Sequence, residues 1–153
     1  MKIKFLLGVA VLASCLAATS LYAQATGTAA EAKAMLEKAI AAVKADKGKA
    51  IEMFIKGEGG FKDRDLYPFC FNIADGKVVA TQATSLIGMD VRTLKDKTGK
   101  VFGEEIYKAA KDGEITESVT YMFPRPGPDT TPVPKVSFVT KVGDLGCGVG
   151  YYK

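Results

Sequence analysis

The sequence predicts one α+β domain, in which an N-terminal helix is followed by a largely antiparallel sheet with a helical insertion. Three observations support this fold class. Apolar residues recur at helical spacing over 29–47, aromatic residues alternate over 66–73, and two arms typical of strands flank a proline-rich loop within 119–142. The 153 residues have room for one domain with a substantial core, and no internal repeat or linker divides them.

The start of the chain has the pattern of a secretory signal peptide. Lys2 and Lys4 precede an apolar run that extends to Ala18, and small residues follow. Cleavage after Ala23 or Ala25 fits this pattern, so we assign residues 1–25 to the signal peptide and 26–153 to the mature domain. The apolar run is shorter than the roughly 20 residues of a membrane span, and we predict no transmembrane segment in the mature chain.

An alternative reading of the same region is lipidation. Residues 12–15 (LASC) resemble a lipoprotein processing box, which would leave Cys15 as a lipid anchor. The apolar character continues past Cys15 to Leu21, whereas such boxes usually close the apolar stretch. We therefore predict secretion to the periplasm, with anchoring through Cys15 as the alternative.

The first predicted element of the mature domain is a helix over 29–47. Thr28 is its N-cap, and Glu31 completes a capping box. Gly48 weakens the pattern, which resumes at Ala50 and stops at Gly57. The pattern predicts one long kinked helix or two helices in line.

The remaining elements follow from alternation and turn residues. Strands are predicted over 66–73, with Pro68 at an edge or entry position, and over 78–80 after a turn at 74–77. Helical pieces are predicted over 91–95 and 102–111. A long-looped hairpin within 119–142 and a last strand over 145–152 complete the sheet. We expect the prolines of 124–134 to stiffen the hairpin loop and keep it out of the ladder.

The composition excludes several kinds of chemistry. The chain contains no histidine, which removes Ser-His-Asp and Cys-His catalysis, most zinc sites and the usual general base. Asp63 and Asp65 lack the further ligands of a calcium loop. Asp65 and Arg64 are equally consistent with a local loop pair, which would contribute little to stability. We predict no cofactor, no metal site and no enzymatic activity.

The charge and the cysteines limit the partners and the compartment. The formal net charge of +4 falls to +2 once Lys2 and Lys4 are removed. So small a positive charge does not indicate binding to nucleic acid or to an anionic membrane. Cys70 and Cys147 remain in the mature chain. In an oxidising compartment they form a disulfide, or else they are two separate buried thiols.

Seven short motifs occur in a fixed order. They are LYPFCFN at 66–72, DGKVV at 75–79, L-x-G-x-D at 86–90, LKD-x-x-GK at 94–100, YMFPRPG at 121–127, PKVSF at 134–138 and GCGVGY at 146–151. Together they resemble the type 2 single Cache domain, sCache_2, over roughly Lys33 to Lys153. Each motif alone is a weak signal, and the ordered set is specific.

The resemblance implies a PAS-like Cache fold, with a long N-terminal helix on a five-stranded antiparallel sheet of strand order 2-1-5-4-3. Such domains are extracytoplasmic sensors that bind small molecules, often small carboxylates, between the sheet and its long loops. The first and fifth strands are neighbours in this topology. The resemblance therefore favours a disulfide between Cys70 and Cys147.

The sequence departs from the family in two places. Ala80, Thr81 and Gln82 stand where these receptors commonly have a His-Pro pair after the second strand, which puts the mode of carboxylate binding in question. The receptors also continue into a membrane helix and a signalling domain, whereas this chain ends after its last strand. The resemblance thus implies a free-standing domain that passes information to a separate partner, for instance a membrane sensor protein.

Five residues are candidates for contact with a ligand, two of them through the resemblance. Lys135 and Tyr121 match family positions and are the expected polar anchors, by an ammonium–carboxylate bond and a hydroxyl hydrogen bond. Tyr67 and Phe69 are expected to wall the pocket, and Arg125 to clamp an anion. The alternatives are a solvated surface lysine, aromatic residues of the sheet core and an exposed loop arginine.

These observations give a leading hypothesis and two alternatives. In the leading hypothesis, the protein is a periplasmic domain that binds and senses a small molecule, and a small carboxylate is the expected ligand. The second is a structural or protein-interaction module with a degenerate pocket, which the missing histidine favours. The weakest is a secreted enzyme.

Overall fold

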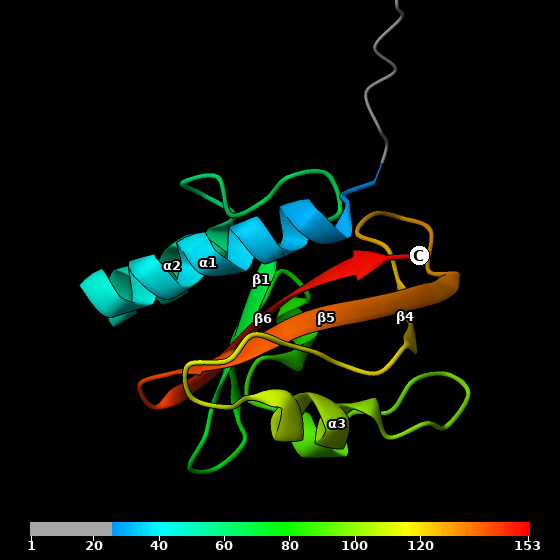
Figure 1. Ribbon diagram of the computed structural model, residues 1–153. Helices are drawn as coiled ribbons and strands as arrows, with labels where there is room; N and C mark the ends of the chain where they lie inside the picture. Colours follow the sequence, from blue (N-terminus) through cyan, green and yellow to red (C-terminus); the bar gives the residue numbers. More distant parts are fainter. Residues whose placement is uncertain (1–25) are drawn as a thin grey trace, which may run out of the picture.

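A computed structural model describes residues 26–153; the predicted signal peptide and Cys15 lie outside these residues. Helices α1 and α2 cover one face of an antiparallel sheet, and α3 with the loops around it covers the other (Figure 1). The elements in chain order are α1 (Ala29–Ala45), α2 (Lys47–Lys56), β1 (Pro68–Asn72), β2 (Val78–Ala80), η1 (Thr84–Leu86), η2 (Val91–Thr93), α3 (Phe102–Ala109), β3 (Thr116–Glu117), β4 (Tyr121–Pro124), β5 (Pro132–Val142) and β6 (Leu145–Tyr152).

The α+β fold and the expected strand order are confirmed, and the described sheet has one strand more than expected. Its order is β2-β1-β6-β5-β3, with β4 also paired to β5. Strand β5 has 11 residues and is long enough for two partners. Its start pairs with β4, and Phe138 and Val139 pair with the two-residue strand β3.

The prediction that the prolines stay out of the ladder is wrong. Pro132 and Pro134 belong to β5, and they lie opposite Pro124 and Met122 of β4. A proline in a strand lacks only the N–H donor, and its carbonyl still accepts. The carbonyl of Pro134 accepts a 3.0 Å hydrogen bond from the backbone N–H of Lys153. The strand that carries Lys135 therefore begins before that residue.

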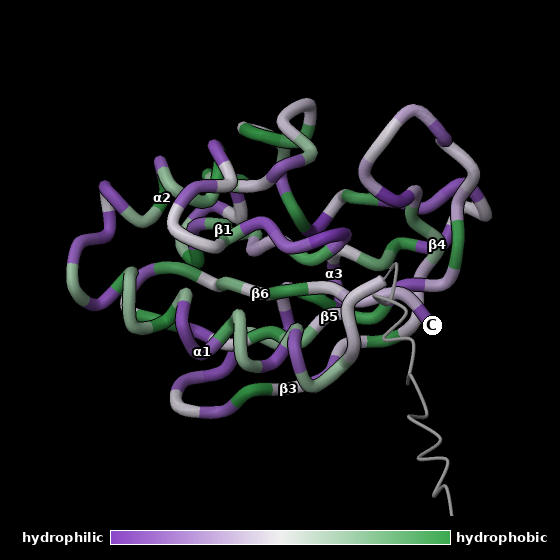
Figure 2. The backbone as a smooth tube through the Cα atoms, turned by 90° about the horizontal axis from the view of Figure 1, so that it is seen from above, coloured by the Kyte–Doolittle hydropathy of each residue, from purple (hydrophilic) through white to green (hydrophobic). Residues whose placement is uncertain are grey.

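The helical region is two helices, and they are not in line. Asp46 has an extended backbone and is both the C-cap of α1 and the N-cap of α2. Helix α2 turns back beside α1, as the view from above in Figure 2 shows. Accordingly, Lys38 in the middle of α1 donates a 2.8 Å hydrogen bond to the carbonyl of Gly59, beyond α2. The capping box of Thr28 and Glu31 and the stop at Gly57 are confirmed.

Two apolar clusters lie on opposite faces of the sheet. One cluster lies between the helices α1 and α2 and the sheet, and it includes Cys70 of β1 and Cys147 of β6. The other lies on the opposite face, where α3 and η2 pack against the sheet, including its strand β4. Cys70 and Cys147 are paired across β1 and β6 and form a disulfide with an S–S distance of 2.07 Å. Both cysteines are completely buried.

The insertion 84–109 is fixed closely over the sheet. A Cβ at Gly103 would collide with the carbonyl of Val91, so only glycine lets α3 pack directly on η2. The carboxylate of Asp96 accepts hydrogen bonds from the backbone N–H groups of Thr98 and Met122, at 2.8 and 3.0 Å. The loop before α3 is thereby tied to β4, and a covered space forms between the insertion and the sheet.

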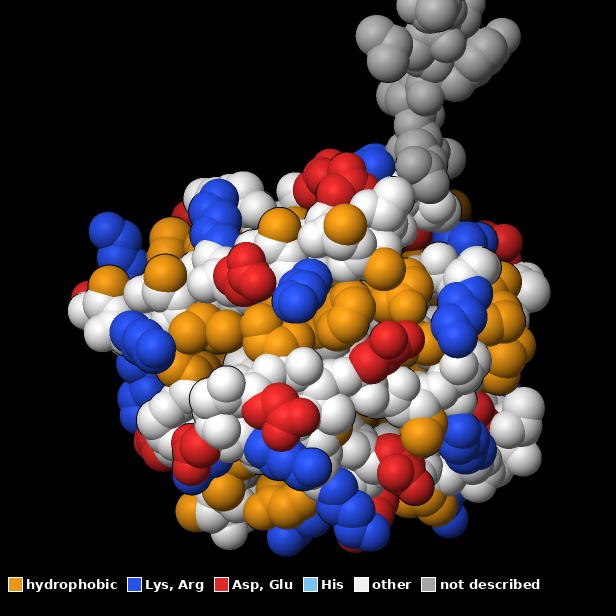
Figure 3. All heavy atoms as spheres, viewed as in Figure 1, with side chains coloured by type: hydrophobic (Ala, Val, Ile, Leu, Met, Phe, Trp, Pro, Cys, Tyr) orange, Lys and Arg blue, Asp and Glu red, His pale blue; other side chains and the backbone are white. Residues whose placement is uncertain are grey.

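The face that carries α1 shows acidic and basic side chains intermingled, with apolar patches between them (Figure 3). No patch of a single sign covers this view. Within residues 26–153, no helix combines the length and apolar character needed to cross a membrane.

Candidate ligand-binding site

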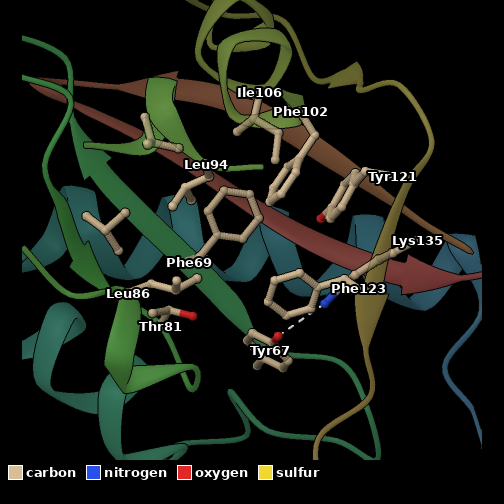
Figure 4. Close-up of a pocket in the computed structure, with 12 residues that line it drawn as sticks. Tyr67, Phe69, Thr81, Leu86, Leu94, Phe102, Ile106, Tyr121, Phe123 and Lys135 are labelled. Atoms are coloured by element: carbon tan, nitrogen blue, oxygen red, sulfur yellow. Dashed lines mark hydrogen bonds between the residues drawn. The ribbon is translucent and has the colours of Figure 1, made fainter. Parts of the chain in front are cut away.

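A small cavity lies between the insertion and the face of the sheet opposite α1 (Figure 4). Its volume is about 40 Å³. Most of its wall is aliphatic or aromatic, and Lys135 is its one charged residue. The lining residues are Tyr67, Phe69, Val78, Thr81, Leu86, Val91, Leu94, Phe102, Ile106, Tyr121, Phe123 and Lys135.

The strand register brings the sheet residues of this cavity together. Lys135 of β5 lies between Tyr121 of β4 and Tyr152 of β6. Side chains that are opposite one another in an antiparallel pair project from the same face. Gly150 is the next β6 residue on that face, and a Cβ there would collide with Cε of Lys135. The glycine therefore makes room for the stem of the lysine.

Lys135 is a buried cation. Its relative exposure is 3%, and its ammonium donates hydrogen bonds to the hydroxyl oxygens of Tyr67 and Tyr152, at 3.1 and 3.3 Å. Among the described residues no carboxylate forms an ion pair with it. Burial lowers the pKa of Lys135 to about 7, and the negative charge of Asp65 opposes this shift.

Aromatic rings surround the same ammonium group. Its nitrogen lies 4.5 Å from the ring centroid of Tyr67, 4.6 Å from that of Tyr152 and 5.1 Å from that of Phe123. Such contacts stabilise a cation by about 0.5–2 kcal/mol each. Burial raises the pKa of Tyr67 to about 12, so its hydroxyl is neutral near pH 7. The rings and hydroxyls therefore stabilise the ammonium of Lys135 but contribute no negative charge.

Tyr121 is also buried beside Lys135. Its ring stacks on Phe102 of α3 at a centroid distance of 4.3 Å. Its hydroxyl and that of Ser137 are hydrogen-bonded at 2.7 Å, and either can donate. Burial raises the pKa of Tyr121 well above its usual value. The hydroxyl is therefore a neutral group that retains hydrogen-bonding capacity.

A second, larger cavity adjoins the first. Its volume is about 260 Å³, and Tyr67, Leu86 and Phe123 line both cavities. We call the two the inner and outer chambers. Arg125 lines the outer chamber, together with Gln82, Ala83, Ser85, Pro124, Pro126 and Gly127.

The five candidate ligand-binding residues all line one of the two chambers. Lys135, Tyr121, Tyr67 and Phe69 line the inner chamber, and Arg125 lines the outer one. The alternative of a solvated surface lysine is wrong for Lys135, because strand pairing on both sides buries it.

Asp65 and Arg64 do not act as the isolated loop pair considered from the sequence. Arg64 forms ion pairs with Glu31 and Asp63. Asp65 is buried, accepts a 2.7 Å hydrogen bond from the N–H of Gly27, and lies 3.7 Å from Nε of Arg125. Among the described residues no group of three Asp, Glu or Cys side chains is arranged to hold a metal ion.

Sequence reasoning missed Tyr152 and Thr81. Tyr152 lies two residues beyond Gly150, so it projects from the same face of β6 as Gly146, Gly148 and Gly150. The register of β6 with β5 identifies this face as the one that carries Lys135. Thr81 lies after β2, where the family commonly has its His-Pro pair, and its side chain lines the inner chamber. Its hydroxyl oxygen accepts a 3.2 Å hydrogen bond from the N–H of Ala83.

A curled antiparallel sheet with helices on both faces and a covered pocket on one of them defines a PAS-like Cache domain. The single Cache domain 2 family matches residues 9–152, nearly the whole chain, and the protein belongs to this family. Cache domains are ligand-binding sensory modules, similar to the ligand-binding domains of periplasmic chemoreceptors.

Solved structures show the same fold. A methyl-accepting chemotaxis protein from Vibrio parahaemolyticus RIMD 2210633 is 21% identical, with a TM-score of 0.64 over 80% of this chain and 86% of that one. A periplasmic sensor domain of a chemotaxis protein is 24% identical, with a TM-score of 0.58 over 80% and 88%. A Cache chemosensory domain whose structure shows the basis of its carboxylic acid recognition is 21% identical. Its TM-score is 0.56, over 80% of this chain and 86% of that one. A search of curated proteins finds no match.

Proposed function

We propose that this protein is an exported sensory domain that binds a small carboxylate at Lys135. The observation that carries the proposal is a buried ammonium group that, among the described residues, has no carboxylate within ion-pair contact. A carboxylate in the inner chamber would supply the missing counter-charge and accept charge-assisted hydrogen bonds. The structurally similar Cache domain associated with carboxylic acid recognition supports this ligand class.

The size of the inner chamber limits the ligand. Its volume of about 40 Å³ corresponds to about three or four water-sized spheres of roughly 10–15 Å³ each. The walls opposite Lys135 are Leu94, Phe102 and Ile106, which offer no hydrogen bonds. A carboxylate with a short aliphatic tail fits both the charge and the walls. Tyr67, Tyr121 and Thr81 supply the neutral hydroxyl groups that fix its orientation.

The proposal includes the location and the mode of action. Residues 1–25 are a signal peptide, and residues 26–153 are the domain that reaches the periplasm. The domain passes information about its ligand to a membrane sensor protein. Neither catalysis nor a cofactor is part of this function. Ligand-dependent co-purification with a membrane protein tests the transfer step, and N-terminal sequencing of the exported protein tests the cleavage site.

A comparison of charged and neutral ligands of the same shape tests the binding step. Thermal unfolding and calorimetric titration of the oxidised protein are measured with acetate, propionate, butyrate and pyruvate, and with propionamide as the neutral counterpart of propionate. A ligand that binds the native state raises the unfolding temperature in a dose-dependent way. We expect this effect from at least one acid and none from propionamide.

Two variants then locate the binding. Lys135→Met keeps the length of the side chain and removes its charge, and we expect it to weaken carboxylate binding by about 10- to 100-fold. Lys141→Met is the matched control, because Lys141 lies on the same strand, pairs with Asp112 and lines neither chamber. No binding of any carboxylate would favour the interaction module. Binding that survives Lys135→Met would place the site elsewhere.

A further inference from the structure

The inner chamber alone holds only part of a ligand larger than a few heavy atoms. The outer chamber has about 260 Å³ against about 40 Å³ for the inner one. Tyr67, Leu86 and Phe123 line both, so these three side chains are the boundary between the chambers. A ligand held at Lys135 extends past them into the outer chamber when its chain is longer.

The outer chamber has a cation of its own. The guanidinium of Arg125 has a side-chain exposure of 42%, and among the described residues it donates no hydrogen bond. Its ion-pair contact is with Oδ2 of Asp65 at 3.7 Å, too long for a hydrogen bond. Oδ2 of Asp65 is itself buried without a hydrogen-bond partner. The contacts of Arg125 with Asp65 and Asp129 are charge interactions without hydrogen bonds, so its N–H donors can still bind a planar acidic group.

Tyr152 fixes the spacing of the two cations. Nζ of Lys135 lies 4.6 Å from the centroid of its ring, and Cζ of Arg125 lies 5.0 Å from the same centroid. The two charged groups are therefore no farther apart than the sum of these distances. The Tyr152 hydroxyl donates a 2.6 Å hydrogen bond to the carbonyl of Pro124, the residue before Arg125. The ring is thereby held against the segment that carries the second cation.

We infer that the ligand carries a second acidic group, which Arg125 binds in the outer chamber while Lys135 binds the first in the inner chamber. The ligand class is a short dicarboxylic acid. This inference rests on the proposed function, because it needs a carboxylate at Lys135. It adds that affinity depends on a second charge at the other end of the ligand.

Pairs of acids with equal chain length test the inference. Succinate is compared with butyrate, and glutarate with valerate, by calorimetric titration of the oxidised full domain. We expect at least one dicarboxylate to bind about 10-fold or more tightly than its monocarboxylate counterpart, the gain of a charge-assisted hydrogen bond. We expect Arg125→Gln to lower dicarboxylate affinity by more than it lowers monocarboxylate affinity, so that the advantage of the second acidic group is lost. Lys95→Gln, an equal charge change at an exposed residue that lines neither chamber, preserves the advantage.

The outcomes separate this inference from the proposed function. Equal affinity within each pair, or a dicarboxylate advantage that survives Arg125→Gln, would overturn the role of Arg125 and leave the proposed function standing. An equal loss for both members of a pair in Arg125→Gln would also overturn it. If no acid of either kind binds, the proposed function fails and the inference fails with it.

Discussion

The ammonium group of Lys135 donates a 3.1 Å hydrogen bond to the hydroxyl of Tyr67, a residue 68 positions earlier in the chain. Both side chains are buried. Because the phenol stays neutral, this contact satisfies the donor but brings no negative charge next to the ammonium, and only the more distant charge of Asp65 acts on it. The pocket is therefore set to attract an anion before any ligand arrives, and its properties depend on the protonation of one lysine.

The first prediction concerns stability and pH. The pKa of Lys135 is about 7 in the folded protein, against an ordinary value of 10.5. Below pH 7 the lysine is protonated in both states, and the cost of burying its charge is fully present. Above pH 7 the folded state loses this proton first, so the free energy of unfolding contributed by Lys135 rises with pH. We expect unliganded Lys135→Met to be more stable than the wild type at about pH 6.5, with a smaller difference at about pH 9.

Urea unfolding at these two pH values measures that difference. The interval stops near pH 9 because burial raises the pKa of Tyr67, and that shift lowers stability once unfolded tyrosine ionises. Lys141→Met serves as the control for charge removal at the surface. An identical pH dependence in the wild type and Lys135→Met would show that Lys135 is not a buried titrating group.

The second prediction concerns proton uptake on binding. A carboxylate beside Lys135 favours its charged form and raises its pKa. At about pH 8, where most of the free protein has lost this proton, binding of butyrate or a tighter carboxylate should therefore take up close to one proton. Calorimetric titration in two buffers with different ionisation enthalpies measures the number. Uptake that is absent in the wild type, or present in Lys135→Met, would contradict the assignment.

The third prediction concerns Gly150. The substitution Gly150→Ala places a methyl group against Cε of Lys135 and 2.9 Å from Oγ of Ser137. We expect the free energy of unfolding to fall by about 1–3 kcal/mol and carboxylate affinity to fall as Lys135 is displaced. Gly48→Ala is the control, because a Cβ there meets only Asp46 at 3.6 Å and the helix should gain about 0.5–1 kcal/mol. Unchanged affinity in Gly150→Ala would mean that the stem of Lys135 is free to move.

The fourth prediction concerns the disulfide. The bond between Cys70 and Cys147 joins residues separated by 77 positions, and the chain-entropy relation gives about 4 kcal/mol of stabilisation. The double variant with alanine at both positions should lose stability of this order in urea unfolding. Its carboxylate affinity should change little at temperatures where it is folded, because the bond lies on the α1 face of the sheet. A fall in the free energy of unfolding of less than about 1 kcal/mol would show that the disulfide contributes little to stability.

Local patterns in the sequence predicted most of the fold. The alternation around Phe69, the turn before Val78 and the capping box at Thr28 depend on neighbouring residues alone. The turn-back at Asp46 was missed because it depends on which face of α2 the sheet buries. The start of β5 at Pro132 was missed because a proline carbonyl can join a ladder when its missing N–H is not needed.

The candidate site was predictable only in part. Lys135 and Tyr121 were found through a resemblance, since no local pattern marks a buried lysine. Tyr152 and Thr81 required the register of β6 with β5 and the packing of the insertion. The outer chamber required three segments distant in sequence to meet around Tyr67, Leu86 and Phe123.

The most direct test of the central claim is a crystal structure of the oxidised domain with the carboxylate that raises its unfolding temperature most. The account predicts a carboxylate oxygen about 2.7–2.9 Å from Nζ of Lys135 in the inner chamber. A ligand bound elsewhere, with the ammonium of Lys135 still held only by Tyr67 and Tyr152, would contradict it.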